Sequence, residues 1–347
     1  MKTTKLPIRL LCAIFSAVLI FSVFSAGLSV TVNAGTITVS GQTGPDYGEK
    51  TIVVSLGDSY SSGEGNNNFY GFDAGNMSQT VQNEDWLAHR SEHAWSGQLK
   101  VSGVNGELKD HRYVKGEFNY TKSVNWYFAA SSGAVTDHIN KSDAANSKQP
   151  KEFYQWDGPI TLYHDTAYLP GQLDIFYNTL GEDRYEVDYV TITIGGNDVG
   201  FSEIVGLAVT AKSSELFDRI DKELNTFYYK GGTHDKIKNA YKRIEKAAPN
   251  ATIIVAGYPE LFSYSGALLG LVSRSDADYI NKAINEFNKR INLIVEECRN
   301  EGMKIEFVSV EERFKGRQAY SQDKADDEYI NRIKPCTRST LLRIGIL

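Results

Sequence analysis

The fold is decided by residues 51–65, Thr-Ile-Val-Val-Ser-Leu-Gly-Asp-Ser-Tyr-Ser-Ser-Gly-Glu-Gly. Residues 51–56 form a largely apolar, β-branched run that stops at Gly57, which predicts a buried strand followed by a tight turn. Ser59 would then lie at the carboxyl edge of the strand, where open parallel α/β sheets bind ligands. A serine at this place is a candidate nucleophile. An ordinary strand-to-helix turn, in which Asp58 or Ser59 caps the next helix, is the alternative.

Four further apolar runs predict strands of the same sheet. They cover 124–130, 189–194, 251–256 and 304–308, and helices are expected at 213–228, 234–247 and 276–300. Strands separated by helices imply right-handed crossovers and a parallel sheet. We therefore expect one α/β domain over 51–330, a three-layer α/β/α sandwich with about five strands. Apolar spacing also predicts a helix within 86–100, whereas 141–170 is expected to be irregular.

The N-terminus has the pattern of an export signal. Basic residues precede an uncharged apolar run from Leu10 to Val32, and Val32-Asn33-Ala34 offers a cleavage site. We expect a signal peptide over 1–34, a linker over 35–50 and a secreted protein without a membrane span after cleavage. The run is also long enough to cross a bilayer, so an uncleaved anchor is the alternative.

Composition and cysteine usage exclude some classes of function. The net charge of −6 gives no reason to expect nucleic acid as a partner. Cys298 and Cys336 could form one disulfide or none, and neither has metal-ligand spacing with a histidine. We therefore expect no metal site.

Three strand ends carry residues suited to acyl transfer. Ser59, Gly133 and Asn197 each follow a predicted strand and would meet at one sheet edge. A hydroxyl nucleophile needs donors that hold the tetrahedral oxyanion, and the backbone N–H groups of Ser59 and Gly133 with the Asn197 amide could supply three. The alternative for Asn197 is a turn residue that tolerates a left-handed backbone.

The same residues resemble a known family. Gly57-Asp58-Ser59-Tyr60-Ser61-Ser62-Gly63-Glu64-Gly65 is similar to the first block of the SGNH (GDSL-type) esterase and lipase superfamily. Ala130-Ser131-Ser132-Gly133-Ala134 resembles its second block and Gly195-Gly196-Asn197-Asp198 its third, in the family's order. Leu87-Ala88-His89-Arg90-Ser91 is similar to secreted bacterial members.

The resemblance implies a fold and a chemistry. It implies a flavodoxin-like sandwich, Ser59 as nucleophile and an oxyanion hole from Ser59, Gly133 and Asn197. It also implies hydrolysis of carboxylic esters without a cofactor. The ester could be a lipid, a small ester or an acylated carbohydrate, because one fold serves all three.

The catalytic histidine is missing from the family position near the C-terminus. The six histidines are His89, His93, His111, His138, His164 and His234, and none follows the fifth predicted strand. A serine hydroxyl needs a base to become a good nucleophile near neutral pH. Either His138 or His164 would have to substitute, and nothing in the spacing selects one of them.

The tail offers an explanation for this departure. Residues 331–347 are basic and resemble nothing that the family has there, which suggests a shifted or truncated reading frame near 332–336. A catalytically inactive module that binds a carbohydrate or a lipid is the second hypothesis, and a structural surface protein is the third. Loop aromatics such as Phe69 and Tyr70 could stack on a sugar or line an acyl pocket.

Overall fold

A computed structural model describes residues 51–66, 69–71, 83–114, 124–157, 161–263, 272–319 and 321. For 153–157 and 161–165 only the backbone is described. The expected signal peptide (1–34), the linker (35–50), the tail (331–347) and Cys336 lie outside the described residues, so these expectations stay predictions.

Five parallel strands form the central sheet, as predicted. They are β1 (Thr51–Gly57), β2 (Val124–Phe128), β5 (Val187–Thr193), β6 (Thr252–Ala256) and β7 (Ile305–Val308), in the spatial order β2-β1-β5-β6-β7. This is the flavodoxin-like order, in which the sheet grows outward in both directions from the first strand. The order reverses between β1 and β5, and ligands bind beyond the strand ends at such a switch point. Ser59 follows β1 and Asn197 follows β5.

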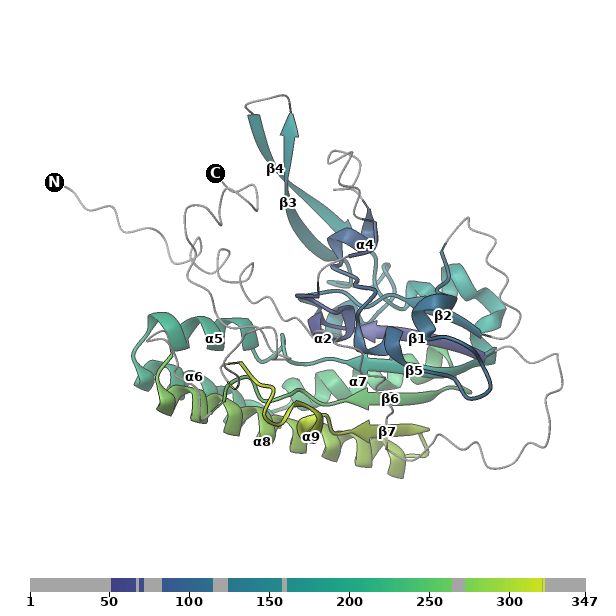
Figure 1. Cartoon of the computed structure of the whole chain (residues 1–347). Helices are drawn as coiled ribbons and strands as arrows, with labels where there is room; N and C mark the ends of the chain where they lie inside the picture. Colours follow the sequence, from purple (N-terminus) through teal and green to yellow (C-terminus); the bar gives the residue numbers. More distant parts are fainter. Residues whose placement is uncertain are drawn as a thin grey trace.

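Both faces of the sheet are buried, because alternate residues of β1 enter different cores. Ile52, Val54 and Leu56 belong to the larger cluster, which includes the apolar faces of α7 (Thr233–Ala247) and α8 (Arg274–Asn300). Val53 points the other way, into a smaller cluster with Trp126. The three-layer sandwich is thereby confirmed, with α8 as the long helix below the sheet in Figure 1.

The part of the chain that the structure describes has five further α-helices. They are α2 (Ser59–Ser62), α4 (Glu84–Leu87), α5 (Phe201–Thr210), α6 (Ser213–Thr226) and α9 (Glu311–Phe314). The predicted helices at 213–228, 234–247 and 276–300 correspond to α6, α7 and α8. Ser273 caps α8, since its hydroxyl accepts a hydrogen bond from the Asp276 N–H at 3.1 Å.

Two predictions about the segments outside the sheet were wrong. The stretch 86–100 is not one helix, because His89 has a positive φ of 54° that ends α4, and a short 3-10 helix (Trp95–Gln98) follows. Within 141–170, β3 (Gln149–Asp157) and β4 (Thr161–Leu169) pair as an antiparallel hairpin that projects from the body in Figure 1. Pro150 and the polar residues of this stretch gave no clear strand period.

Candidate active site

The turn between β1 and α2 depends on a glycine. Gly57 has φ of +121°, and a Cβ built there would lie 2.3 Å from the Thr193 carbonyl oxygen. Side chains are thus excluded both by backbone conformation and by close approach. The next N–H, that of Asp58, donates to the same carbonyl at 2.9 Å. The end of β1 is therefore fixed to the end of β5.

Asp58 is the buried centre of this arrangement. Its carboxylate accepts hydrogen bonds from the Tyr60 N–H (3.1 Å), the Thr193 hydroxyl (2.8 Å) and the Tyr258 hydroxyl (2.5 Å). Burial raises the pKa of Asp58 to about 6, against the lowering effect of these hydrogen bonds. The Tyr258 hydroxyl accepts in turn from the Gly196 N–H at 3.0 Å. One buried network thus joins the ends of β1, β5 and β6.

Ser59 is the first residue of α2 and is half-buried. Asp58 caps this helix through the Tyr60 N–H, so the capping alternative is correct for Asp58 and leaves Ser59 free. The Ser59 hydroxyl makes no hydrogen bond with any residue that the structure describes. A hydroxyl that is held on a rigid turn and is not used structurally is available for chemistry.

The loop after β2 lies directly beside this turn. The Ser131 N–H donates to the Gly57 carbonyl at 3.0 Å, and the exposed Gly133 follows two residues later with φ of +74°. Arg90 holds the start of the loop, because its guanidinium donates to the carbonyls of Ala130 (2.9 Å) and Ala129 (3.2 Å). Arg90 of the Leu87–Ser91 motif therefore supports the loop that carries the second block.

The loop after β5 is joined to the same segment. The Asn197 amide donates to the Ala134 carbonyl at 2.9 Å, which uses one of its two N–H bonds. The Asp198 carboxylate accepts from the N–H (2.9 Å) and the hydroxyl (2.7 Å) of Thr136. The structure thus brings together the three loops that carry Ser59, Gly133 and Asn197, as expected for one sheet edge.

The described histidine side chains are held by other groups. His93, His111 and His234 contact Glu92 (3.3 Å), the Asn105 carbonyl (2.9 Å) and the carboxylates of Asp235 and Glu297 (3.0 and 3.1 Å). Nδ1 of His138 accepts the Val135 N–H at 3.0 Å, and burial lowers the pKa of this imidazole to about 4. No histidine side chain within the described part of the chain bonds to Ser59. His164 lies on β4, and its side chain is outside that part.

His89 contacts Glu64, and this contact was not predicted from the sequence. Its Nδ1 lies 2.6 Å from a carboxylate oxygen of Glu64, which belongs to the first block. Burial raises the pKa of Glu64, but the charge and hydrogen bond of His89, with a hydrogen bond from Ser132, outweigh it and leave the pKa low. The ring also stacks on Phe69 with centroids 4.7 Å apart. A carboxylate that holds Nδ1 leaves Nε2 as the basic atom of the ring.

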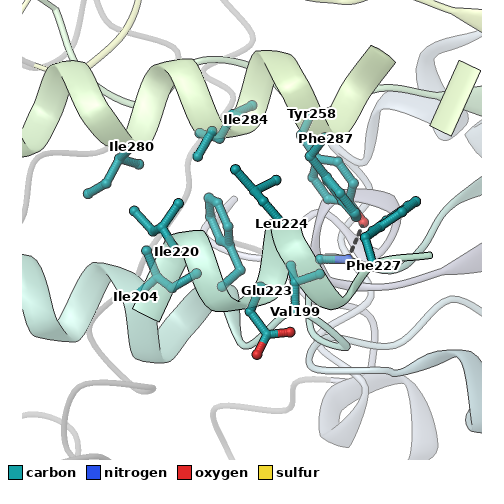
Figure 2. Close-up of a pocket in the computed structure, with 13 residues that line it drawn as sticks. Val199, Ile204, Ile220, Glu223, Leu224, Phe227, Tyr258, Ile280, Ile284 and Phe287 are labelled. Carbon is teal, nitrogen blue, oxygen red and sulfur yellow. Dashed lines mark hydrogen bonds between the residues drawn. The ribbon is translucent and has the colours of Figure 1, made fainter. Parts of the chain in front are cut away.

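An apolar pocket lies on the other side of Gly196 (Figure 2). Its walls come from α5, α6 and α8, with Ile204, Ile220, Leu224, Ile280, Ile284 and Phe287 among them. Tyr258 closes one end, and the dashed line in Figure 2 marks its hydrogen bond with the Gly196 N–H. The cavity has a volume of about 40 Å³. The loop that carries Asn197 thus borders this apolar space at Gly196 and contacts the loop after β2 through Asn197.

Neither a metal cluster nor a membrane helix is found in the part of the chain that the structure describes. No group of three or more histidine, cysteine, aspartate or glutamate side chains there could hold a metal ion. No helix among those residues is long and apolar enough to cross a bilayer. Cys298 is buried within α8, and burial raises the pKa of its thiol to about 11.

Known proteins resemble this chain in sequence and in fold. A 115-residue segment is 31% identical to Lipase 1 of Streptomyces coelicolor, and a segment of equal length is 31% identical to a lipase of Streptomyces rimosus. Each match covers 33% of this chain and 42% of the lipase, so the chain matches about two fifths of the length of these relatives. No protein-family model matches the chain.

The fold likeness extends over most of the chain. The structure of phospholipase A1 from Streptomyces albidoflavus superposes with a TM-score of 0.51 at 19% identity, covering 80% of this chain and 86% of that enzyme. In this chain the three blocks follow the carboxyl ends of β1, β2 and β5 in a flavodoxin-like sheet. The sequence likeness to lipases of Streptomyces and the shared fold agree with the resemblance to SGNH-type hydrolases.

Proposed function

We propose that the protein is an exported hydrolase of carboxylic esters with short acyl chains, in which Ser59 is the nucleophile. The observation that carries the proposal is the convergence of three loops beside a hydroxyl that has no structural hydrogen bond. The Ser131 N–H bonds to Gly57, and the Asn197 amide bonds to Ala134. Export is supported by the apolar run within residues 1–34.

Ser59 would attack the ester carbonyl, and the resulting oxyanion would be held by up to three donors. These are the N–H groups of Ser59 and Gly133 and the second N–H of the Asn197 amide. None of the three takes part in another hydrogen bond within the described chain. Neutral donors suit this role because their fixed dipoles act on charge that develops only in the transition state. Collapse of the intermediate would break the bond to the alkoxide, which takes the proton that Ser59 loses and leaves as the alcohol. Water would then hydrolyse the acyl-enzyme to the carboxylic acid and restore the Ser59 hydroxyl.

The apolar pocket supports a preference for esters whose acyl group is short but longer than acetyl. Its volume of about 40 Å³ corresponds to roughly three spheres of the size that holds one water molecule. A chain of about three carbon atoms fits this space. Its wall at Gly196 directly precedes Asn197, so an acyl group placed there would extend from the oxyanion site.

The deciding experiment is hydrolysis of p-nitrophenyl acetate, butyrate and octanoate by the purified chain and by Ser59→Ala. We expect turnover that is best with butyrate and that Ser59→Ala abolishes. Equal turnover by Ser59→Ala would refute the nucleophile assignment. His89→Ala belongs in the same series, because it tests whether His89 is the base. Removing a catalytic base typically lowers the rate about 10²–10⁴-fold.

A module that binds an ester without cleaving it is the second candidate. It is favoured by one observation, the absence of a histidine bonded to Ser59 among the described side chains. The chain and Ser59→Ala would then be equally inert, while both would bind a butyryl ester analogue in calorimetry. Loss of that binding in Leu224→Trp would locate the ligand in the apolar pocket.

A further inference from the structure

Residues of the β3 strand contact the loop that carries the proposed oxyanion donor. Gln149 is buried, and its side-chain amide donates to the Ser132 carbonyl oxygen at 2.7 Å. The ammonium of Lys151 donates to the same oxygen at 2.5 Å. Both side chains stand on one face of the strand, since they are two residues apart.

The Ser132 carbonyl belongs to the peptide whose N–H is that of Gly133. A peptide group is planar, so fixing its oxygen also fixes the direction of its N–H. The N–H of Ser132 is held too, because it donates to the Ala88 carbonyl at 2.9 Å. A cation at the carbonyl end polarises the peptide and makes the N–H at the other end a stronger donor.

We propose that Lys151 and Gln149 are positioning residues that hold and polarise the Ser132–Gly133 peptide so that the Gly133 N–H serves the oxyanion. This inference rests on the proposed ester hydrolysis and adds two residues that lie outside the three sequence blocks. A glycine suits position 133, because its φ of +74° is a backbone conformation that other residues rarely adopt. The projecting hairpin thereby acquires a function at its base.

Burial and charged groups from several elements determine the charge of Lys151. Burial lowers the pKa of Lys151 to about 8, the carboxylate of Glu64 raises it and the charge of Arg90 lowers it further. His138 also lies close enough for Lys151 to lower its pKa, and His89 is held by Glu64. Because His138 is neutral near pH 7, Glu64 and Arg90 are the charged groups that decide the protonation of Lys151. The polarising charge is present below about pH 8 and is lost above it.

The test is the pH dependence of the Gly133 amide proton resonance, measured by NMR on the full chain. This measurement does not require turnover. Labelling with carbonyl-¹³C serine and ¹⁵N glycine selects the Ser–Gly peptides, and Gly133→Ala assigns the signal. We expect a downfield amide proton that moves upfield with a midpoint near pH 8. Lys151→Met should start at the upfield position and not titrate, and Lys151→Arg should stay downfield through about pH 9, because a guanidinium does not titrate there.

The exposed Lys148, three residues earlier, provides the matched control. Lys148→Met should titrate as the wild type does. A wild-type Gly133 signal that does not titrate, or one that titrates equally in Lys151→Met, would overturn the proposal. Gln149→Leu should shift the resonance upfield at every pH and leave the midpoint in place.

Kinetics supply the second readout. Removing an oxyanion donor outright costs about 10²–10³ in kcat, so weakening one should cost about tenfold. Lys151→Met should lower kcat about tenfold with little change in KM, since the interaction strengthens only in the transition state. Lys151→Arg should recover most of the rate. If the wild type shows no turnover, only the ester hydrolase proposal is refuted. The resonance experiment still decides whether Lys151 polarises the Ser132–Gly133 peptide.

Discussion

Removing the Tyr258 hydroxyl should destabilise the fold in a pH-dependent way. The hydroxyl donates to the Asp58 carboxylate at 2.5 Å and accepts from the Gly196 N–H at 3.0 Å, and all three residues are buried. Tyr258→Phe therefore removes a hydrogen bond to a charged group, about 1.5–3 kcal/mol, and leaves a buried N–H unpaired, about 1–3 kcal/mol. We expect a total loss of about 4 kcal/mol where Asp58 is ionised.

The pH dependence follows from the raised pKa of Asp58. Because this pKa is about 6 in the folded protein and 3.8 ordinarily, ionising Asp58 in place disfavours folding. That cost is absent below about pH 4 and complete above about pH 6, where it reaches about 3 kcal/mol. The Tyr258 hydrogen bond lowers the pKa, so Tyr258→Phe raises it further and increases the cost only at the higher pH.

Urea unfolding near pH 5 and near pH 8 measures the effect. The loss of unfolding free energy in Tyr258→Phe should be about 1–2 kcal/mol larger near pH 8, because the missing bond there is to a carboxylate. Tyr241→Phe is the control: Tyr241 is fully buried in the same core, and its hydroxyl has no hydrogen-bond partner among the described residues. That variant should lose no stability. Equal losses at both pH values, or an equal loss in Tyr241→Phe, would refute the reasoning.

Three further predictions concern the turn, the oxyanion site and the pocket. Gly57→Ala should lower the free energy of unfolding by about 3 kcal/mol or more in urea titrations, because a strained φ and a Cβ 2.3 Å from a carbonyl oxygen combine; a stable variant would contradict the observed turn. Asn197→Ala should lower kcat for p-nitrophenyl butyrate about 10²–10³-fold with KM little changed, and an unchanged kcat would remove Asn197 from the oxyanion site. Leu224→Trp should lower kcat/KM for the butyrate about tenfold, since two methylene groups lose about 0.8 kcal/mol each, and it should spare the acetate; equal losses for both esters would place the acyl group elsewhere.

The sheet could be predicted from sequence because its signals are local. Each strand is a short apolar run that ends in glycine or small residues, and α8 carries a long apolar stripe. The three blocks then predicted which loops meet, because parallel strands present their carboxyl ends at one edge. The structure brings the loops that carry Ser59, Gly133 and Asn197 together for this reason.

The groups that fix the loops could not be predicted, because their partners are distant in sequence. Tyr258 is 200 residues from Asp58, and nothing in its local sequence indicated this contact. Gln149 and Lys151 lie in a stretch without apolar alternation, so neither the hairpin nor its contact with Ser132 had a sequence signal. The Glu64–His89 pair depends on the positive φ of His89, which interrupts the expected helix.

The network that shapes the site is separate from the group that would activate it. Asp58, Tyr258 and Asn197 are held by hydroxyl, amide and backbone partners, and no histidine bonds to any of them in the described chain. The geometry at the sheet edge therefore does not depend on a catalytic base. Chemistry at Ser59 does depend on one, because its hydroxyl must lose a proton as it attacks. Stability measurements on Tyr258 and turnover measurements on Ser59 thus probe different properties, and only the second distinguishes an esterase from a module that binds esters.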